Sequence, residues 1–194
     1  AVAARLIKRI VDAPTNEAVQ IQRLLGARGG GVDVPSLAAS LSISPTMPAA
    51  VVGFAGVGDQ ATVHLSGALR LHASAFHRSS LATAMGERIY VLFPGEVAAR
   101  SLESWTRETI ARIEMRTGTA TRAALVTSIA TLSDVAAARV EVDRVLDRTT
   151  GNDRVTTLEE SRTSVLLGEI VELVANHEHL LDPRIGKLAE YDVR

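Results

Sequence analysis

The feature that most constrains the fold of this chain is the stretch LATAMGERIYVLFP at residues 81–94. Two apolar runs rich in β-forming residues flank a glycine that can take positive φ, which predicts two strands joined by a tight turn at 85–88. The second strand, at 89–93, is apolar on both faces. We therefore expect both faces to be covered and the hairpin to lie inside a sheet.

Three further stretches predict strands of the same sheet. Residues 49–55, AAVVGFA, are apolar on both faces and predict a central strand that pairs with the hairpin. Residues 120–129 predict another strand, and the polar alternation at 154–158 predicts a last strand at an edge of the sheet.

The clearest helix is predicted at 96–116, with one apolar stripe and a stop at Gly118. The stripe consists of Leu102, Trp105, Thr109 and Ile113. A tryptophan on such a stripe is more typical of a core than of a platform for a ligand. Trp105 is therefore expected to pack inside the domain.

Weaker helical patterns complete the order of elements. They lie at 36–41, at 61–77 and after an N-cap at Ser133-Asp134. The sequence thus predicts an α+β fold, in which a mostly antiparallel sheet is covered by helices and carries N- and C-terminal helical extensions.

Helical patterns also occupy both ends of the chain. Residues 2–11 and 15–25 form an amphipathic pair, which either dimerises or packs on its own domain, and the sequence leaves both alternatives open. Two more helices are predicted at 161–174 and after Pro183. Because the sequence starts without Met and ends abruptly at Arg194, we expect a fragment of a longer protein.

The hairpin turn carries a resemblance to a known family. Met85-Gly86-Glu87-Arg88-Ile89 falls on the five-residue signature of the GGDEF-type palm domain of diguanylate cyclases, which this order of elements resembles. Gly86 and Glu87 satisfy the signature, whereas Met85 replaces a glycine, Arg88 an acid and Ile89 the aromatic residue. The sequence is more similar to the GGDEF-like domain of the CdaR and PucR families of bacterial transcriptional regulators, where such degenerate turns are usual.

Three more stretches support this narrower resemblance. They are residues 33–41 before the first strand, residues 133–146, and the ending at 179–192. In those regulators a stretch like the last one leads into a C-terminal helix-turn-helix that binds DNA. The resemblance therefore implies a homodimer that contacts DNA only through a C-terminal domain not in this chain.

The same resemblance implies a division of the chain into three parts. Residues 1–32 would be an N-terminal helical connector, and residues 33–160 a degenerate GGDEF-like regulatory domain. Residues 161–194 would be C-terminal helices leading to the absent DNA-binding module.

Cyclase chemistry needs acids that hold Mg²⁺ against triphosphate oxygens. Glu87 is the only acid on the turn, and the end of the first strand offers no acid before Asp59. Arg88 adds a positive charge that disfavours a divalent cation. We therefore predict a structural turn, with no catalytic, cofactor-binding or metal-binding residue, and no cofactor.

Other motifs give no further chemistry. The glycines at 26–31 lack the Lys-Ser or Lys-Thr of a phosphate loop and are more typical of a helix stop and linker. The five histidines show no zinc-like spacing, and no GxSxG elbow is present. These histidines are His64, His72, His77, His177 and His179.

Composition limits the kinds of partner and the cellular location that we expect for this protein. The net charge of −1 and the scattered arginines disfavour nucleic-acid binding by these residues. No signal-peptide pattern is present, and no apolar run reaches the roughly 18 to 20 residues of a membrane span. The absence of cysteine excludes disulfides and fits a cytoplasmic location, so we expect a soluble cytoplasmic protein with no membrane partner.

The functional expectation is a non-catalytic regulatory and dimerisation domain of a CdaR/PucR-like transcriptional regulator, and not an enzyme. Two alternatives remain. One is a small-molecule sensor with an unknown effector, and the other is an active nucleotide cyclase.

Overall fold

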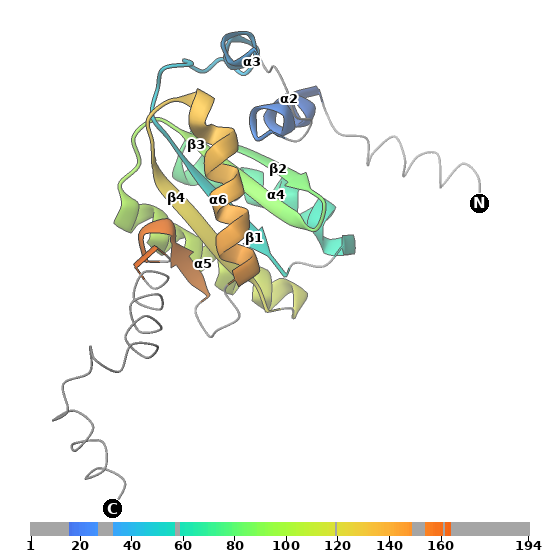
Figure 1. Cartoon of the computed structure of the whole chain (residues 1–194). Helices are drawn as coiled ribbons and strands as arrows, with labels where there is room; N and C mark the ends of the chain where they lie inside the picture. The colour runs from blue at the N-terminus through green and yellow to red at the C-terminus, as the bar shows by residue number, and fades with distance from the viewer. Residues whose placement is uncertain are drawn as a thin grey trace, which may run out of the picture. The chain divides into compact units, whose positions relative to one another are not determined.

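The structure is a computed structural model (Figure 1), which describes residues 16–26, 33–56, 59–118, 120–148, 154–160 and 162–163. The chain divides into two compact units, Ala1–Leu158 and Glu159–Arg194. All the elements described below belong to the first unit. The helices predicted at 2–11 and after Pro183, and most of the one predicted at 161–174, lie outside the described residues.

The first unit is built on a five-stranded mixed sheet with the order β2-β3-β1-β4-β5. Neighbouring strands are antiparallel except β4 and β5, which are parallel. The strands are β1 (Ala49–Ala55), β2 (Leu81–Met85), β3 (Arg88–Pro94), β4 (Arg122–Ile129) and β5 (Val155–Thr157). The predicted α+β class, the central position of β1 beside the hairpin and the edge position of β5 are confirmed.

The hairpin lies inside the sheet only through its second strand. β3 pairs with both β2 and β1, and every residue after Arg88 in it is buried. β2 forms the edge of the sheet, and its last two residues, Ala84 and Met85, are only half-buried. The prediction that the whole hairpin lies inside is therefore wrong for β2. The two-sided apolar pattern that suggested it belongs to β3 alone.

Five α-helices and one 3-10 turn are described. They are α2 (Asn16–Leu24), α3 (Val34–Ser40), α4 (Asp59–Phe76), α5 (Ala99–Thr117), η1 (Leu132–Asp134) and α6 (Val135–Arg148). As predicted, α5 ends at Gly118, which is left-handed at φ 68° and donates its N–H to the carbonyl of Glu114.

The start of α6 differs from the prediction. Ser133-Asp134 does not form a simple N-cap, because both residues lie within η1. The hydroxyl of Thr131 donates to the Asp134 carboxylate at 3.0 Å, so a polar contact fixes this turn one residue before α6 begins at Val135.

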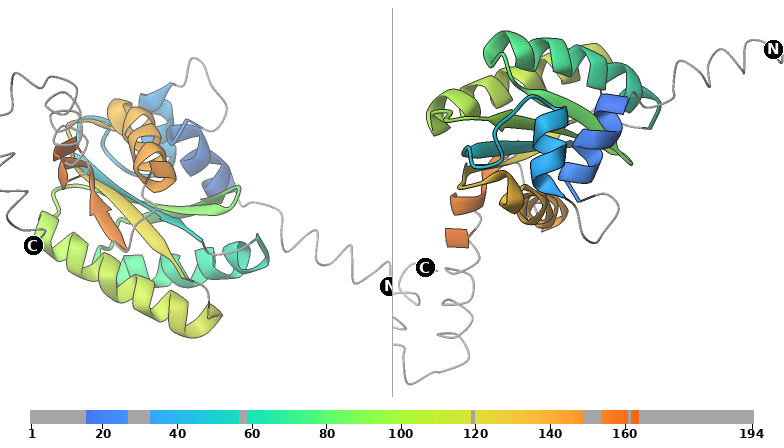
Figure 2. Two further views of the ribbon diagram at one scale, coloured as in Figure 1. Left: turned by 60° about the horizontal axis from the view of Figure 1, so that its bottom comes forward. Right: turned by 90° about the horizontal axis from the view of Figure 1, so that it is seen from above.

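Helices cover both faces of the sheet (Figure 2). The alternation of side chains along β1 shows which helices share a core with each face. Ala50, Val52 and Phe54 enter one core with α4 and α5. Ala49, Val51 and Ala55 enter a second core with α2, α3 and α6. We call these the α4–α5 face and the α6 face.

Helix α2 packs on the sheet of its own domain. Ile21, Leu24 and Leu25 are buried in the core of the α6 face, and the Gln22 side-chain amide donates to the carbonyl of Ala84 in β2 at 2.8 Å. For the described helix of the N-terminal pair, packing on its own domain is therefore the alternative observed.

The connectivity from β1 to β4 is β-α-β-β-α-β, with the order β2-β3-β1-β4 in the sheet. In this arrangement α4 and α5 both lie on one face of the sheet. The other face is covered by α6, which follows β4 in the chain. The register sets Phe54 of β1 opposite Ile89 of β3. The end of β1 and the hairpin turn therefore meet at the same end of the sheet.

Candidate functional site

The hairpin turn is the first candidate site. Gly86 has φ +61°, and a Cβ added there would meet no heavy atom within 4 Å. Gly86 and Glu87 are both exposed, whereas Ile89 is fully buried and Met85 is half-buried against the core of the α6 face. Only the tip of the turn is thus open to solvent.

Arg88, the fourth residue of the turn sequence, is bound to α6. Its Nη1 lies 2.6 Å from Asp143 Oδ1, and its Nη2 donates to Asp147. The hydroxyl of Tyr90 donates to the same oxygen of Asp143, and Arg139 Nη1 lies 2.8 Å from Asp143 Oδ2. We call these five residues the hairpin network. It ties the turn to the middle of α6 through one shared carboxylate.

The hairpin network raises the pKa of two of its residues, Arg88 and Tyr90. Burial alone would lower the pKa of Arg88, but its hydrogen bonds to Asp143 and Asp147 outweigh burial and raise that pKa. Burial, together with the hydrogen bond to Asp143, raises the pKa of Tyr90 to about 12. Arg88 is therefore charged and Tyr90 neutral throughout the physiological pH range.

Most carboxylate oxygens of the hairpin network already accept hydrogen bonds from arginine, which disfavours metal binding there. Both oxygens of Asp143 accept from guanidinium groups, and one oxygen of Asp147 accepts from Arg88. Among the described residues no group of three histidines or acids could hold a metal ion. Glu87 stands alone at the exposed tip, and the side chain of Asp59 lies outside what the structure describes.

The sequence reasoning found Arg88 but missed its partners. Arg139, Asp143 and Asp147 recur every four residues on α6, so they share one side of that helix. This spacing was the available signal. Its meaning depends on where α6 crosses the hairpin, and no local pattern encodes that crossing.

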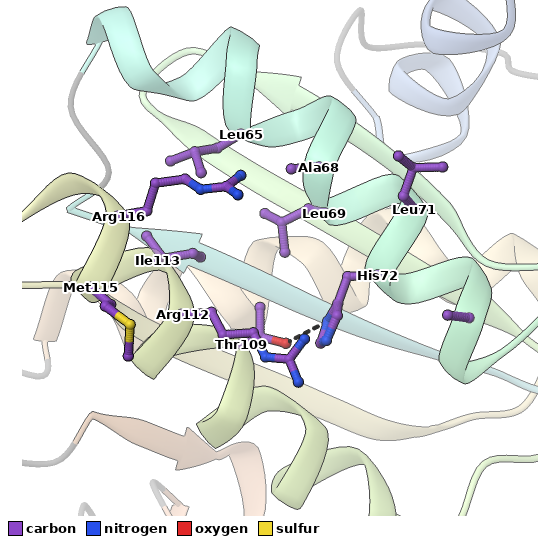
Figure 3. A pocket seen from close by; sticks show the side chains of 11 residues that line it. Leu65, Ala68, Leu69, Leu71, His72, Thr109, Arg112, Ile113, Met115 and Arg116 are labelled. Carbon is purple, nitrogen blue, oxygen red and sulfur yellow. Dashed lines mark hydrogen bonds between the residues drawn. The ribbon is translucent and has the colours of Figure 1, made fainter.

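The second candidate site lies on the opposite face of the sheet (Figure 3). A groove of about 790 Å³ runs between α4 and α5. Its walls are mainly aliphatic. They come from Leu65, Ala68, Leu69, Leu71, His72 and Ala75 of α4 and from Thr109, Arg112, Ile113, Met115 and Arg116 of α5. We call it the α4–α5 groove.

Polar groups in the groove are few and separate into two kinds. His72 Nδ1 and Thr109 Oγ1 share a hydrogen bond at 3.2 Å, so these two side chains satisfy one another across the helices. Burial, followed by the nearby charge of Arg112, lowers the pKa of His72, while Glu108 opposes this change. At neutral pH the charge of the lining residues therefore comes from Arg112 and Arg116.

An aromatic cluster lies beneath one end of the groove. Trp105 is buried, as its stripe predicted, and contacts Phe93 edge-on with ring centroids 5.1 Å apart. The rings of His72 and Phe76 stack on it at 5.6 and 5.7 Å. His72 thus connects the lining of the groove directly to Trp105.

The rim of the groove exposes large apolar side chains. Leu71 is 70% exposed and Met115 is 87% exposed. The sequence analysis places Leu71 only within the helix predicted at 61–77 and gives no role to Met115. It therefore missed this site, because a groove depends on how far apart two helices lie.

No protein-family model matches this chain, and no curated protein sequence matches it. In the described part of the chain no helix is both long enough and apolar enough to cross a bilayer.

Proposed function

We propose that this chain is the regulatory domain of a CdaR/PucR-like transcriptional regulator and that it does not catalyse a reaction. In this proposal the domain has a GGDEF-like palm, is cytoplasmic and forms a homodimer. It reaches DNA only through a module outside this chain. Its effect on that module is a shift in population between two dimer arrangements.

The observation that carries this proposal is the position of Arg88. A nucleotide cyclase would use the turn to present acids to Mg²⁺ and a triphosphate. Here the fourth position of the signature is a guanidinium bound to Asp143 and Asp147 of α6. The two acids nearest to the turn by contact are thereby used for structure, and Glu87 is left as a single carboxylate.

The β-α-β-β-α-β connectivity is a second support, because it is the order that the resemblance to a palm domain implies. Fold alone does not establish function, so the turn, and not the topology, supports the absence of catalysis.

The direct experiment is incubation of the protein with GTP or ATP and Mg²⁺, followed by chromatography of the products. We expect no turnover. Turnover that Glu87→Ala abolishes, and that Glu96→Ala on a different loop leaves intact, would show an active cyclase and overturn the proposal.

The dimer is tested separately by sedimentation velocity over a range of concentrations. We expect a dimer at tens of micromolar. A strict monomer at that concentration would contradict the dimerisation part of the proposal and would leave the absence of catalysis standing.

A further inference from the structure

We propose that the α4–α5 groove is a binding site for a small amphipathic anion, that is, a carboxylate or sulfonate attached to an alkyl or aryl body. The inference goes beyond the proposed regulatory function and does not depend on it. It rests on the volume of the groove, the chemistry of its walls and the charges at its rim.

The size and lining fit a small molecule. Sites for small ligands commonly enclose about 300–1,000 Å³ and combine apolar walls with a few polar groups. The α4–α5 groove has about 790 Å³, and Leu65, Leu69 and Ile113 supply aliphatic walls from both helices. An alkyl or aryl body placed there removes apolar surface from water on both sides.

The charges select an anion. Arg112 and Arg116 lie one turn apart on α5, and no acid is among the described lining residues. Among the described residues, Arg112 has one long ion pair, with Nη2 3.9 Å from Glu108 Oε2, and Arg116 has no ion pair. Both guanidinium groups are thus available to a carboxylate, which they bind in a planar geometry.

The other two polar residues of the lining carry no charge at neutral pH, which fits the same class of ligand. His72 and Thr109 are paired with one another, so neither leaves a charge facing the apolar body. A nucleic-acid backbone would meet these aliphatic walls with its phosphates, which the walls do not favour.

A second copy of this chain is a poorer occupant. A two-fold contact whose axis passes near α5 would bring Arg112 and Arg116 of both copies together. Like charges at such a contact are unfavourable.

The single tryptophan provides the measurement. Trp105 stacks on His72, which lines the groove, so occupancy of the groove should alter its fluorescence. Decanoate and decyltrimethylammonium are titrated into the protein below their micellar concentrations. We expect a saturable change with decanoate and at least about tenfold weaker binding of the cation of equal chain length.

Four variants locate the site. Replacing both arginines, as Arg112→Gln with Arg116→Gln, should weaken decanoate binding about five- to thirtyfold, and replacing both with lysine should restore part of it. Arg107→Gln is the matched control, because Arg107 is exposed on the same helix, pairs with Glu103 and does not line the groove. Ala68→Phe should fill the groove and abolish binding, with circular dichroism confirming the fold of each variant.

Several results would overturn the inference. These are equal binding of anion and cation, an unchanged affinity in the double glutamine variant, and unchanged binding in Ala68→Phe. A further contrary result would be an unmodified protein that is dimeric, does not bind decanoate, and becomes monomeric when Leu71→Ser is introduced. The groove would then be an interface between copies instead. None of these results bears on whether the protein turns over GTP or ATP. Failure of the ligand proposal is therefore distinct from failure of the proposed regulatory function.

Discussion

The two faces of the sheet are covered by helices that pack in different ways. On the α6 face, α6 is held by the hairpin network and approaches β1 closely at Gly53, where an added Cβ would lie 2.5 Å from Val142 Cγ1. On the α4–α5 face, the two helices leave a groove between them and expose Leu71 and Met115 at its rim. The first arrangement packs α6 directly against β1 at Gly53, and the second keeps room for a ligand.

This difference suggests a division of labour. The α6 face fixes the turn that resembles a catalytic signature, so that region is committed to stability. The α4–α5 face is where a small molecule would gain contacts. Four predictions test the comparison, beginning with the largest expected effect.

Removing the shared carboxylate should be the most damaging change. Asp143→Ala should lower the free energy of unfolding by about 2–4 kcal/mol, because Arg88, Arg139 and Tyr90 lose a common, largely buried acceptor. Urea unfolding followed by circular dichroism measures this loss. The control is Glu108→Ala on the other face, where the ion pair is exposed and should contribute no more than about 0.5 kcal/mol. Equal losses of unfolding free energy in Asp143→Ala and Glu108→Ala would contradict the proposed difference between the two faces.

Glycine replacements should differ in sign between the faces. Gly53→Ala should cost about 1–3 kcal/mol, because its Cβ meets Val142, Leu146 and Tyr90. Gly67→Ala on α4 should stabilise the protein by roughly 0.5–1 kcal/mol, because nothing lies within 4 Å of the added atom and alanine favours helix. Thermal or urea unfolding of both variants decides this, and a stable Gly53→Ala protein would mean that α6 is not closely packed.

The stability of the protein should depend on pH through His72, which lies on the α4–α5 face. The pKa of His72 is lowered in the folded state, so the unfolded chain binds a proton first as the pH falls below 6.5. Stability is therefore full above that pH and is lost as the pH falls through the folded pKa. His72→Gln should weaken this dependence, measured as the unfolding midpoint over roughly pH 5 to 8. An unchanged slope would show that His72 does not titrate in this environment.

The rim residues should matter least for stability. Leu71→Ser combined with Met115→Ser should change the free energy of unfolding by no more than about 0.5 kcal/mol, because both side chains are already in solvent. A loss larger than about 1 kcal/mol, measured in the same urea experiment, would show that another surface covers the rim in solution.

Much of the fold could be predicted because it depends on local patterns. The two-sided apolar run of β3 requires cover on both faces. Glycine is one of the few residue types that fit a left-handed helix end without strain, and Gly118 occupies that position after α5. The edge position of β5 followed from its half-polar sequence. Each of these inferences uses residues close together in the chain.

The candidate sites could be predicted only in part because they depend on distant contacts. Arg88 was identified as incompatible with a cation site, yet its partners Asp143 and Asp147 lie more than fifty positions away. Gly53 reads as an ordinary strand residue until α6 is placed above it. The α4–α5 groove requires the separation of two helices, which periodicity does not specify.

The contact between Gln22 and the carbonyl of Ala84 has a consequence for solubility of the folded state. The outer edge of β2 carries unpaired backbone groups, and such an edge can nucleate strand-to-strand polymerisation. The side chain of α2 occupies one of these groups, and at the opposite edge the short β5 pairs with β4. Helix α2 therefore covers one backbone group of the β2 edge, and the three-residue length of β5 limits the number of open groups at the other edge.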